Sequence, residues 1–269
     1  MKKRMLVIAD MHCGHEYGAR DDMHIRRWIR IHKNCTDISE VQEERWNWLK
    51  KNIDRYKPYD ICLVNGDSID GKGEMTGGRE EIEHSLMDQA EIATNILKYI
   101  KAKKYIHTVG TAYHTGKNED FERIVANDLG TELEDNKVFG VNGRFFDVRH
   151  FVTNASSPVS NKAIAIKKDQ IFAALNSYHL EIEGNKEITV KPSFYIRSHV
   201  HKYDMATGST YRIKLITTPC LQMRSFYGDR VCNGLVDYGF LIFDIDTKGE
   251  VSCKECIQQI QIHSPVETF

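Results

Sequence analysis

Short apolar runs alternate with amphipathic stretches in the first half of the chain. The apolar runs lie at 4–9, 59–67 and 104–110. They have the length and the polar or glycine boundaries of buried strands. The amphipathic stretches lie at 40–56, 79–101 and about 117–129. Their apolar spacing predicts helices, the first ended by Pro58 and the last by Gly130. This alternation predicts an α/β domain.

The second half of the chain is richer in strand-like runs. These lie at 144–152, 193–201, 211–219 and 238–246, with one helix predicted at about 160–179. The shift predicts a second sheet packed on the first. No linker, repeat or low-complexity tract divides the chain, so we expect a single domain over 1–269. Residues 18–39 are charged with little periodicity and are predicted to be an insertion, either a lid or a solvated loop or helix.

Composition and charge exclude several classes of protein. A chain of 269 residues can bury a substantial core, and 41% hydrophobic with 28% charged residues is ordinary for a soluble protein. The net charge of −1 gives no global attraction to duplex nucleic acid, although a local basic patch could still serve. The apolar start is too short for a signal peptide, and no run approaches a membrane span. We therefore expect a cytoplasmic protein without a membrane partner, its seven cysteines being free thiols.

Carboxylates and imidazoles stand at or near the ends of four predicted strands. They are Asp10, His12, Asp67, His150, His199 and His201. Each motif alone is usually structural, although residues 199 and 201 point to one face because alternate strand positions do so. Ligands of α/β sheets gather beyond the carboxyl ends of strands, and this mixture of donors suits Zn, Mn, Fe or Ni. The set exceeds one tetrahedral site, and two ions about 3.5–4 Å apart can clamp a phosphoryl group and activate a water.

The order of these motifs resembles the calcineurin-like metallophosphoesterase superfamily. Its pattern is D-x-H, G-D-x-x-D, G-N-H-[ED], a lone His and G-H-x-H, and the resemblance spans residues 5 to about 202. It implies two packed mixed β-sheets flanked by helices, in a four-layer α/β/β/α sandwich. It also implies two divalent metal ions, for which we expect Mn²⁺ with Fe, Zn or Ni as alternatives.

The resemblance assigns a role to each matching residue. Asp10, His12 and His201 would bind one ion, His150 and His199 the other, with Asp67 bridging both. Asp70, in "NGDSID", would support catalysis by holding a ligand or the acidic water in place. His15 is predicted to touch substrate or to cap its turn.

One motif departs from the family pattern. In "VGTAYHTG", Gly110 is present, but Thr111 stands where Asn would bind the second ion, and the histidine arrives two residues late as His114. His114 would act either as the general acid on the leaving oxygen or as a replacement ligand. Ser198 replaces a glycine of the last motif, a change that we do not expect to matter.

These residues favour a dimetal phosphoester hydrolase that uses a metal-activated water. "GDSIDGKG" lacks the arginine typical of protein phosphatases, and only scattered basic residues such as Arg197 flank the motifs. A diester needs fewer cationic clamps than a monoester, and Tyr113 could stack a base. We therefore expect a phosphodiesterase acting on a nucleotide or single-stranded nucleic acid. The alternatives are a phosphomonoesterase, including a protein phosphatase, and a non-catalytic scaffold; the sequence leaves the oligomeric state open.

Overall fold

A six-stranded β-sheet forms the centre of the molecule. The computed structural model describes residues 1–32, 36–74, 77–115, 120–152, 178–182, 186–207, 213–223, 225 and 236–259. The strands of this sheet are β1 (Lys3–Ile8), β2 (Ile61–Asn65), β3 (Lys104–Thr108), β4 (Leu133–Glu134), β12 (Asp237–Ile245) and β13 (Val251–Gln259). Their order is β13-β12-β1-β2-β3-β4, and β1 to β4 are parallel. The carboxyl ends of these four strands therefore share one edge of the sheet.

A second, five-stranded sheet packs on the first. Its strands are β5 (Asn136–Val141), β6 (Arg144–Arg149), β9 (Phe194–Arg197), β10 (Asp204–Thr207) and β11 (Lys214–Thr217). Their order is β10-β11-β9-β6-β5, with β6, β9 and β11 parallel. A separate hairpin is formed by β7 (Tyr178–Ile182) and β8 (Lys186–Val190). The second sheet is mixed like the first, as the sequence predicts.

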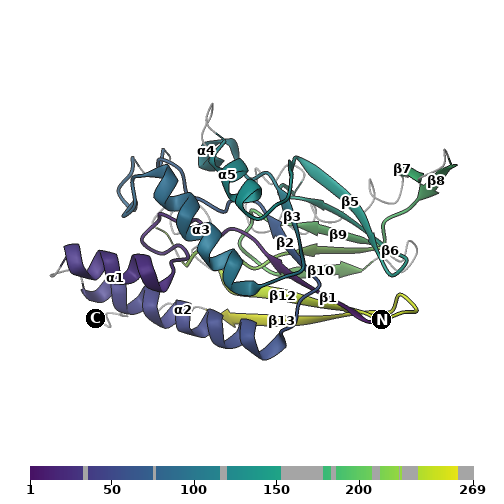
Figure 1. Ribbon diagram of the computed structural model, residues 1–269, viewed down its shortest axis with the longest axis horizontal. Coiled ribbons are helices and arrows are strands. Elements are labelled where there is room, and N and C mark those ends of the chain that lie inside the picture. The colour runs from purple at the N-terminus through teal and green to yellow at the C-terminus, as the bar shows by residue number, and fades with distance from the viewer. Residues whose placement is uncertain are drawn as a thin grey trace, which may run out of the picture.

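Helices cover the face of the first sheet that is turned away from the second (Figure 1). They are α1 (Asp22–Ile31), α2 (Thr36–Tyr56), α3 (Leu86–Ile100) and α5 (Phe121–Asp128), whereas the short helix α4 (Ala112–Thr115) belongs to the loop that follows β3. Side chains alternate along β1: Leu6 and Ile8 join the core under the helices, whereas Met5 and Val7 join the core between the sheets. The first sheet is thus buried on both faces, which explains the unbroken apolar runs of its strands.

The predicted fold class, two packed mixed sheets flanked by helices, is confirmed. The helix predicted at about 160–179 lies almost entirely outside the described residues. No helix within the described ranges has the length and apolar character needed to span a membrane.

One predicted helix boundary was wrong, and one of the alternatives for the insertion is borne out. The helix expected from residue 79 begins only at Leu86, capped by Ser85, because Ile82 and Glu83 donate backbone hydrogen bonds to Gly14 instead. The segment 18–39 contains α1 and the start of α2, so of the alternatives for this insertion the structure has a helix. The charged residues of α1 had masked its amphipathic spacing.

Candidate metal centre

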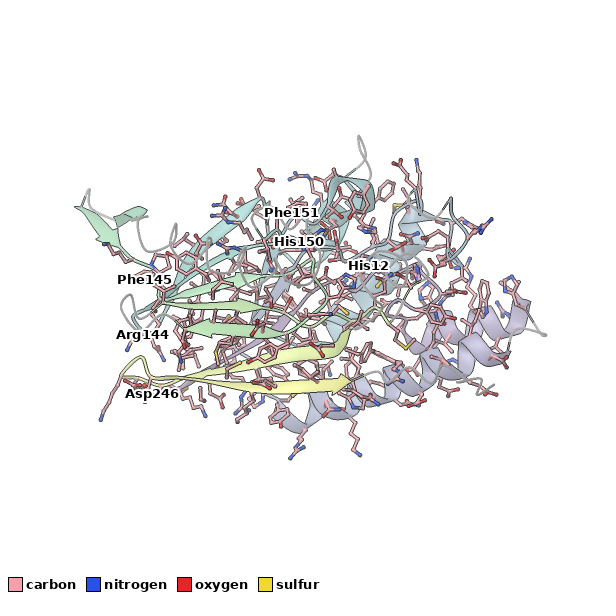
Figure 2. The ribbon with its side chains drawn as sticks, turned by 180° about the vertical axis from the view of Figure 1, so that it is seen from behind. His12, Arg144, Phe145, His150, Phe151 and Asp246 are labelled. Atoms are coloured by element: carbon pink, nitrogen blue, oxygen red, sulfur yellow. The ribbon has the colours of Figure 1, made fainter. Side chains whose placement is uncertain are left out.

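The predicted ligands come together where strands of the two sheets end. Asp10 and His12 follow β1, Asp67 follows β2, His150 follows β6, and His199 and His201 follow β9. Figure 2 shows His12 and His150, from different sheets, approaching the same region. Three groups of donor atoms each lie within 4.8 Å of one another. Two of them contain only predicted ligands: Asp10, His12 and His201, here called the first ligand group, and Asp67, His150 and His199, the second ligand group. The third contains His12, Asp67 and His114.

The donor atoms of these groups face one another. His12 Nε2 and His201 Nε2 are 3.2 Å apart, and His201 Nε2 lies 3.3 Å from Asp10 Oδ1. His150 Nε2 lies 3.0 Å from Asp67 Oδ2 but without the alignment of a hydrogen bond. Asp10 Oδ1 and His150 Nε2 are thus buried without a hydrogen-bond partner. Converging carboxylate oxygens and imidazole nitrogens with unused lone pairs fit two divalent ions.

The backbone at the ligands is strained. The φ angle is 48° at Asp10, 44° at His12, 50° at Asp67, 72° at His199 and 55° at His201. Non-glycine residues adopt this left-handed region rarely and at a cost of about 1–3 kcal/mol each. Five of the six ligands share it, which indicates that the strands are bent at their ends to aim side chains inward.

Two glycines allow the loops to approach one another closely. A Cβ on Gly66 would lie 2.5 Å from His150 Nδ1, and one on Gly110 would lie 2.1 Å from Asp67 Oδ1. Either substitution would force the loop away from a ligand. The glycines of "NGD" and "VGT" are therefore required by the centre.

Two of the imidazole rings are oriented by hydrogen bonds at their Nδ1 atoms. His12 donates through Nδ1 to Asp70 Oδ1 at 2.7 Å, and His150 donates through Nδ1 to the Asn65 carbonyl at 2.7 Å. In each ring this bond leaves Nε2 as the nitrogen directed into the centre. Asp70 thus makes a contact with His12 of the kind that its predicted supporting role requires, whereas the contact of Asn65 was missed.

Buried carboxylates make the centre a site that favours cations. Burial alone would lower the pKa of His150, but Asp67 and Asp10 raise it to about 9. Burial alone would raise the pKa of Asp67, but the imidazoles of His150 and His114 hold it well below its usual range. His199, buried beside His150, has its pKa lowered to about 4, which keeps this ring neutral as a metal ligand must be.

The altered third motif fixes Asp67 rather than contributing a ligand through Thr111. Thr111 donates to Asp67 Oδ1 through its backbone N–H at 2.6 Å and through Oγ1 at 3.0 Å. The fully buried Glu122 accepts from the backbone N–H groups of Ser68 and Gly110 at 2.7 and 2.8 Å. It thereby ties the loop of Asp67 to that of Thr111. Nothing in the sequence around Glu122 indicated this role, since it lies within an ordinary amphipathic helix.

His114 lies at the edge of the centre on the side of His12. The two rings are 4.4 Å apart at an angle of 82°, and the His114 side chain is 17% exposed. It donates through Nδ1 to the Asp70 carbonyl at 2.6 Å. A donor atom of His114 falls within 4.8 Å of donor atoms of His12, from the first ligand group, and of Asp67, from the second, and no group joins His114 with His150 or His199 among the described residues.

The other predicted residues have diverse positions. His15 is buried: its Nδ1 accepts from the Tyr17 backbone, and its Nε2 lies 3.6 Å from Glu80, as a turn-capping residue would. Tyr113 is half-buried, with its ring 4.4 Å from that of His114. Substrate contacts by His15 and Tyr113 stay predictions.

Two further residues differ from what the sequence suggested. Arg197 is buried in an ion pair with Asp147 at 2.8 Å and so is no clamp for phosphate. The Ser198 hydroxyl, expected not to matter, is buried and hydrogen-bonded to Asn65 and Thr218.

Phe151 borders the centre and was not predicted. Its side chain is 47% exposed, and its ring lies 5.1 Å from that of His199 and 5.4 Å from that of His150 (Figure 2). The other exposed large hydrophobic residues in the described part of the chain are Met or Ile. An exposed aromatic ring beside two ligands is a surface on which a planar group can stack.

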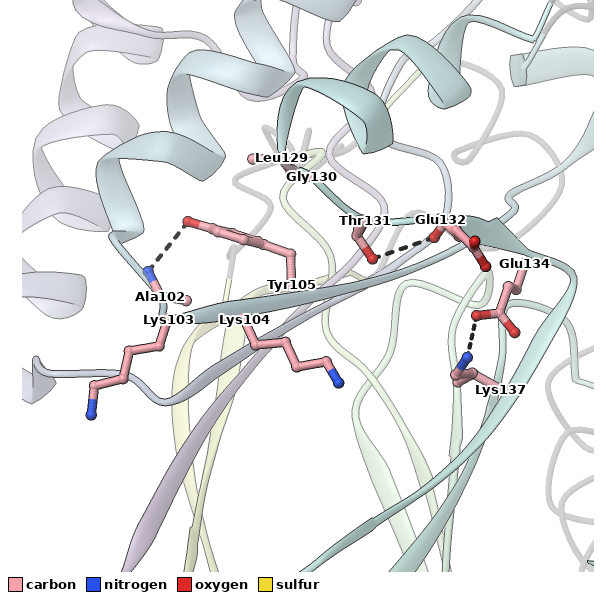
Figure 3. A pocket seen from close by; sticks show the side chains of 10 residues that line it. All are labelled: Ala102, Lys103, Lys104, Tyr105, Leu129, Gly130, Thr131, Glu132, Glu134 and Lys137. Carbon is pink, nitrogen blue, oxygen red and sulfur yellow. Dashed lines mark hydrogen bonds and ion pairs between the residues drawn. The ribbon is translucent and has the colours of Figure 1, made fainter. Parts of the chain in front are cut away.

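A surface pocket of about 450 Å³ lies elsewhere (Figure 3). It is lined by residues 102–105, 129–132, 134 and 137, at the amino end of β3 and thus opposite to the ligand edge. Its Lys137 pairs with Glu134, and its Lys103 pairs with Asp60 outside the lining. The pocket contains none of the predicted site residues.

Comparison with known proteins gives similarities of structure only. No family model matches the chain, and no curated protein matches its sequence. Wild-type Vps29 complexed with zinc, from Entamoeba histolytica, shares 14% identity at a TM-score of 0.44, over 95% of this chain and 98% of that one. An archaeal phosphodiesterase shares 12% identity at 0.40, over 95% and 99%, and a predicted phosphoesterase from Streptococcus pneumoniae shares 11% at 0.34, over 91% and 84%. Similarities of this size establish neither an activity nor a substrate.

Proposed function

We propose that this chain is a dimetal-dependent phosphoester hydrolase that prefers phosphodiesters of nucleotides or nucleic acid. The observation that carries the proposal is the convergence of two aspartates and four histidines, delivered by strained strand ends of both sheets, into two groups of facing donor atoms. Two divalent ions held there would polarise the phosphoryl oxygens and supply a water of lowered pKa.

The chain's own residues orient this site and handle protons. Thr111 fixes Asp67, which would be shared between the ions, and Asp70 fixes His12. His114 is assigned as the general acid, because its ring lies beside that of His12 and its donor atom groups with His12 and Asp67 rather than with His150 and His199, the ligands that a missing fourth donor would have to join. Since its Nδ1 is bonded to the Asp70 carbonyl, Nε2 is the atom that would deliver a proton to the leaving oxygen.

Two features favour a diester with an aromatic group. Arg197, the basic residue nearest the last motif on its amino side, is already paired with Asp147. It therefore does not offer a positive charge to the second negative charge of a phosphate monoester. Phe151 and Tyr113 border the second ligand group and His114, respectively. Stacking of a base on an aromatic side chain is worth about 1–3 kcal/mol. A nucleotide or single-stranded nucleic acid supplies both the diester and the base.

The test compares an aryl phosphodiester with the matching monoester after loading with Mn²⁺. We expect turnover of the diester to exceed that of the monoester, and to fall by about 10³-fold or more in Asp67→Asn, since each ion contributes several kcal/mol to transition-state stabilisation. Preferred turnover of the monoester would identify a phosphatase. Two tightly bound ions without turnover of either ester or of oligonucleotides would identify a scaffold, and absence of bound metal would refute the proposal.

A further inference from the structure

A buried polar cluster lies behind the metal centre, between the two sheets. Its members are Asn65, Thr108, Ser198 and Thr218, and each of them has 0% of its surface exposed. The core between the sheets is otherwise built from aliphatic and aromatic side chains such as Leu63. Apolar packing is non-directional, so a hydrogen-bonded cluster in this place fixes the position of one sheet on the other more closely than the surrounding core does.

The side chain of Asn65 joins three strands. Its Nδ2 donates to Ser198 Oγ at 2.6 Å, after β9, and to the Arg149 carbonyl at 3.2 Å, at the end of β6. Its Oδ1 accepts from Thr108 Oγ1 at 2.6 Å, in β3 of the first sheet. Ser198 Oγ in turn shares a hydrogen bond of 2.7 Å with Thr218 Oγ1. Both donor hydrogens of the amide are used.

These partners are the immediate neighbours of metal ligands. Arg149 precedes His150, and Ser198 precedes His199. The backbone of Asn65 accepts from His150 Nδ1 at 2.7 Å, and Ser198 N–H donates to the His150 carbonyl at 2.8 Å. One cluster therefore controls both the ring orientation of His150 and the exit of the chain toward His199.

We infer that Asn65 and Ser198 are positioning residues for the ion bound by the second ligand group. The inference rests on the proposed metal-dependent function. It assigns the two ions separate supports: Asp70 orients His12 for the first ligand group, whereas Asn65 and Ser198 hold His150 and His199 for the second. Groups that orient metal ligands typically change metal affinity by about 10–100-fold when they are removed.

The experiment measures Mn²⁺ affinity by calorimetric titration in two single-ion backgrounds. His201→Ala leaves the second ligand group intact, and His199→Ala leaves the first intact. In the His201→Ala background, adding Ser198→Ala should weaken Mn²⁺ binding about 10-fold, and adding Asp70→Asn should not. In the His199→Ala background, adding Asp70→Asn should weaken Mn²⁺ binding, and adding Ser198→Ala should not.

Matched variants separate positioning from general loss of stability. Val148→Ala removes a buried methyl pair from the same core between the sheets and contacts no member of the cluster in the hydrogen bonds described. Thr218→Val removes the hydroxyl that supports Ser198 while keeping its shape, and Thr218→Ser restores it. We expect weakened binding with Thr218→Val, recovery with Thr218→Ser, and wild-type affinity with Val148→Ala at an equal or larger drop in unfolding midpoint.

The outcomes distinguish the inference from the function on which it rests. Failure of the wild-type protein to bind Mn²⁺ would refute the proposed function and this inference with it. Tight binding of two ions by the wild type, with Ser198→Ala and Thr218→Val no weaker than Val148→Ala, would refute the positioning role alone. In the wild-type background, loss of the exchange-coupled Mn²⁺ pair from the electron paramagnetic resonance spectrum of Ser198→Ala would support it independently of turnover.

Discussion

Carboxylates that lie near the two ends of β1 have opposite kinds of neighbours. At the amino end, Arg4 donates to Asp244 at 2.7 Å, and Lys254 lies 3.0 Å from the same carboxylate. At the carboxyl end, Asp10 and Asp67 have imidazole, hydroxyl and backbone neighbours, and in the described part of the chain neither forms an ion pair with Lys or Arg.

The difference concerns how the negative charge of the carboxylates is balanced at each end. Lys and Arg bring permanent positive charge, so the amino end is balanced by the protein itself. Imidazoles bring lone pairs that accept either a proton or a metal ion. The carboxyl end of β1 can therefore be balanced by an exchangeable proton or divalent ion. We expect the stability of the protein to respond to divalent ions through this end and not through the amino end.

The largest effect is expected at the carboxyl end of β1, where His114 is proposed to deliver a proton. His114→Ala should lower kcat by about 10²–10⁴-fold for a diester with an alkoxide leaving group, because general acids contribute this much when the leaving oxygen is basic. The loss should be much smaller for a nitrophenolate, which leaves without a proton. Elemental analysis should still find two bound ions.

The control for this variant is His84→Ala, which removes an exposed histidine. It should leave both substrates unaffected. If His114→Ala instead loses one ion, or loses activity equally for both leaving groups, His114 is a ligand and the assignment as general acid is wrong.

Addition of Mn²⁺ tests the comparison directly through stability. At a free concentration of 100 times its dissociation constant, each ion that binds only the folded protein should raise the free energy of unfolding by about 2.7 kcal/mol. Asp244→Asn should keep this response, since it alters the end with permanent cations. Asp67→Asn should lose most of it, and an unchanged response in Asp67→Asn would contradict the proposed ligand role.

The sequence predicted which residues converge at this edge because their signal is local. Asp10, His12 and Asp67 each end an apolar run, and parallel strands bring such ends to one edge. His150 and His199 follow parallel strands of the second sheet for the same reason. The second packed sheet thus follows from periodicity, and the location of the candidate centre follows from the order of the motifs at the strand ends.

The supporting residues could not be predicted, because their partners are distant in the sequence. Asn65 meets Ser198 across 133 positions, and Glu122 meets Ser68 across 54. A polar residue at the end of "ICLVN" was a weak signal for Asn65, whereas Glu122 in its helix gave none. The left-handed backbone at His12 and His199 likewise results from tertiary contacts that override local preference.

A smaller effect is expected at Phe151, which borders His150 and His199. Phe151→Ala should lower kcat/KM for a nucleotide diester about 10-fold, mostly through KM, because stacking on a base is worth about 1–3 kcal/mol. An alkyl diester, which has no ring to stack, should be hydrolysed as by the wild type. Phe151→Trp is the matched variant that should retain nucleotide turnover.

The same measurements can refute the stacking role. An equal loss for both substrates would remove the argument for an aromatic substrate. A large fall in the unfolding midpoint of Phe151→Ala would identify Phe151 as a packing residue instead.

The smallest effect on metal binding is expected at the amino end of β1. Burial alone would raise the pKa of Asp244, but hydrogen bonds from Arg4, Lys2 and Lys254 hold it well below its usual range. A depressed carboxyl pKa stabilises the fold above the unfolded value near pH 4, and this contribution is lost as the pH falls below it. Asp244→Asn should therefore lower the free energy of unfolding by about 1–3 kcal/mol at pH 7.

That difference should shrink in urea titrations as the pH is lowered from about 4 towards 2, since the wild-type carboxyl then takes up its proton. Exposed Glu132→Gln is the control and should change stability little at any pH. Mn²⁺ affinity should be the same in both variants as in the wild type. A shift in Mn²⁺ affinity on Asp244→Asn would mean that β1 transmits charge or strain between its ends. The ion pairs of Asp244 with Lys and Arg would then not be independent of the carboxylates proposed to bind metal.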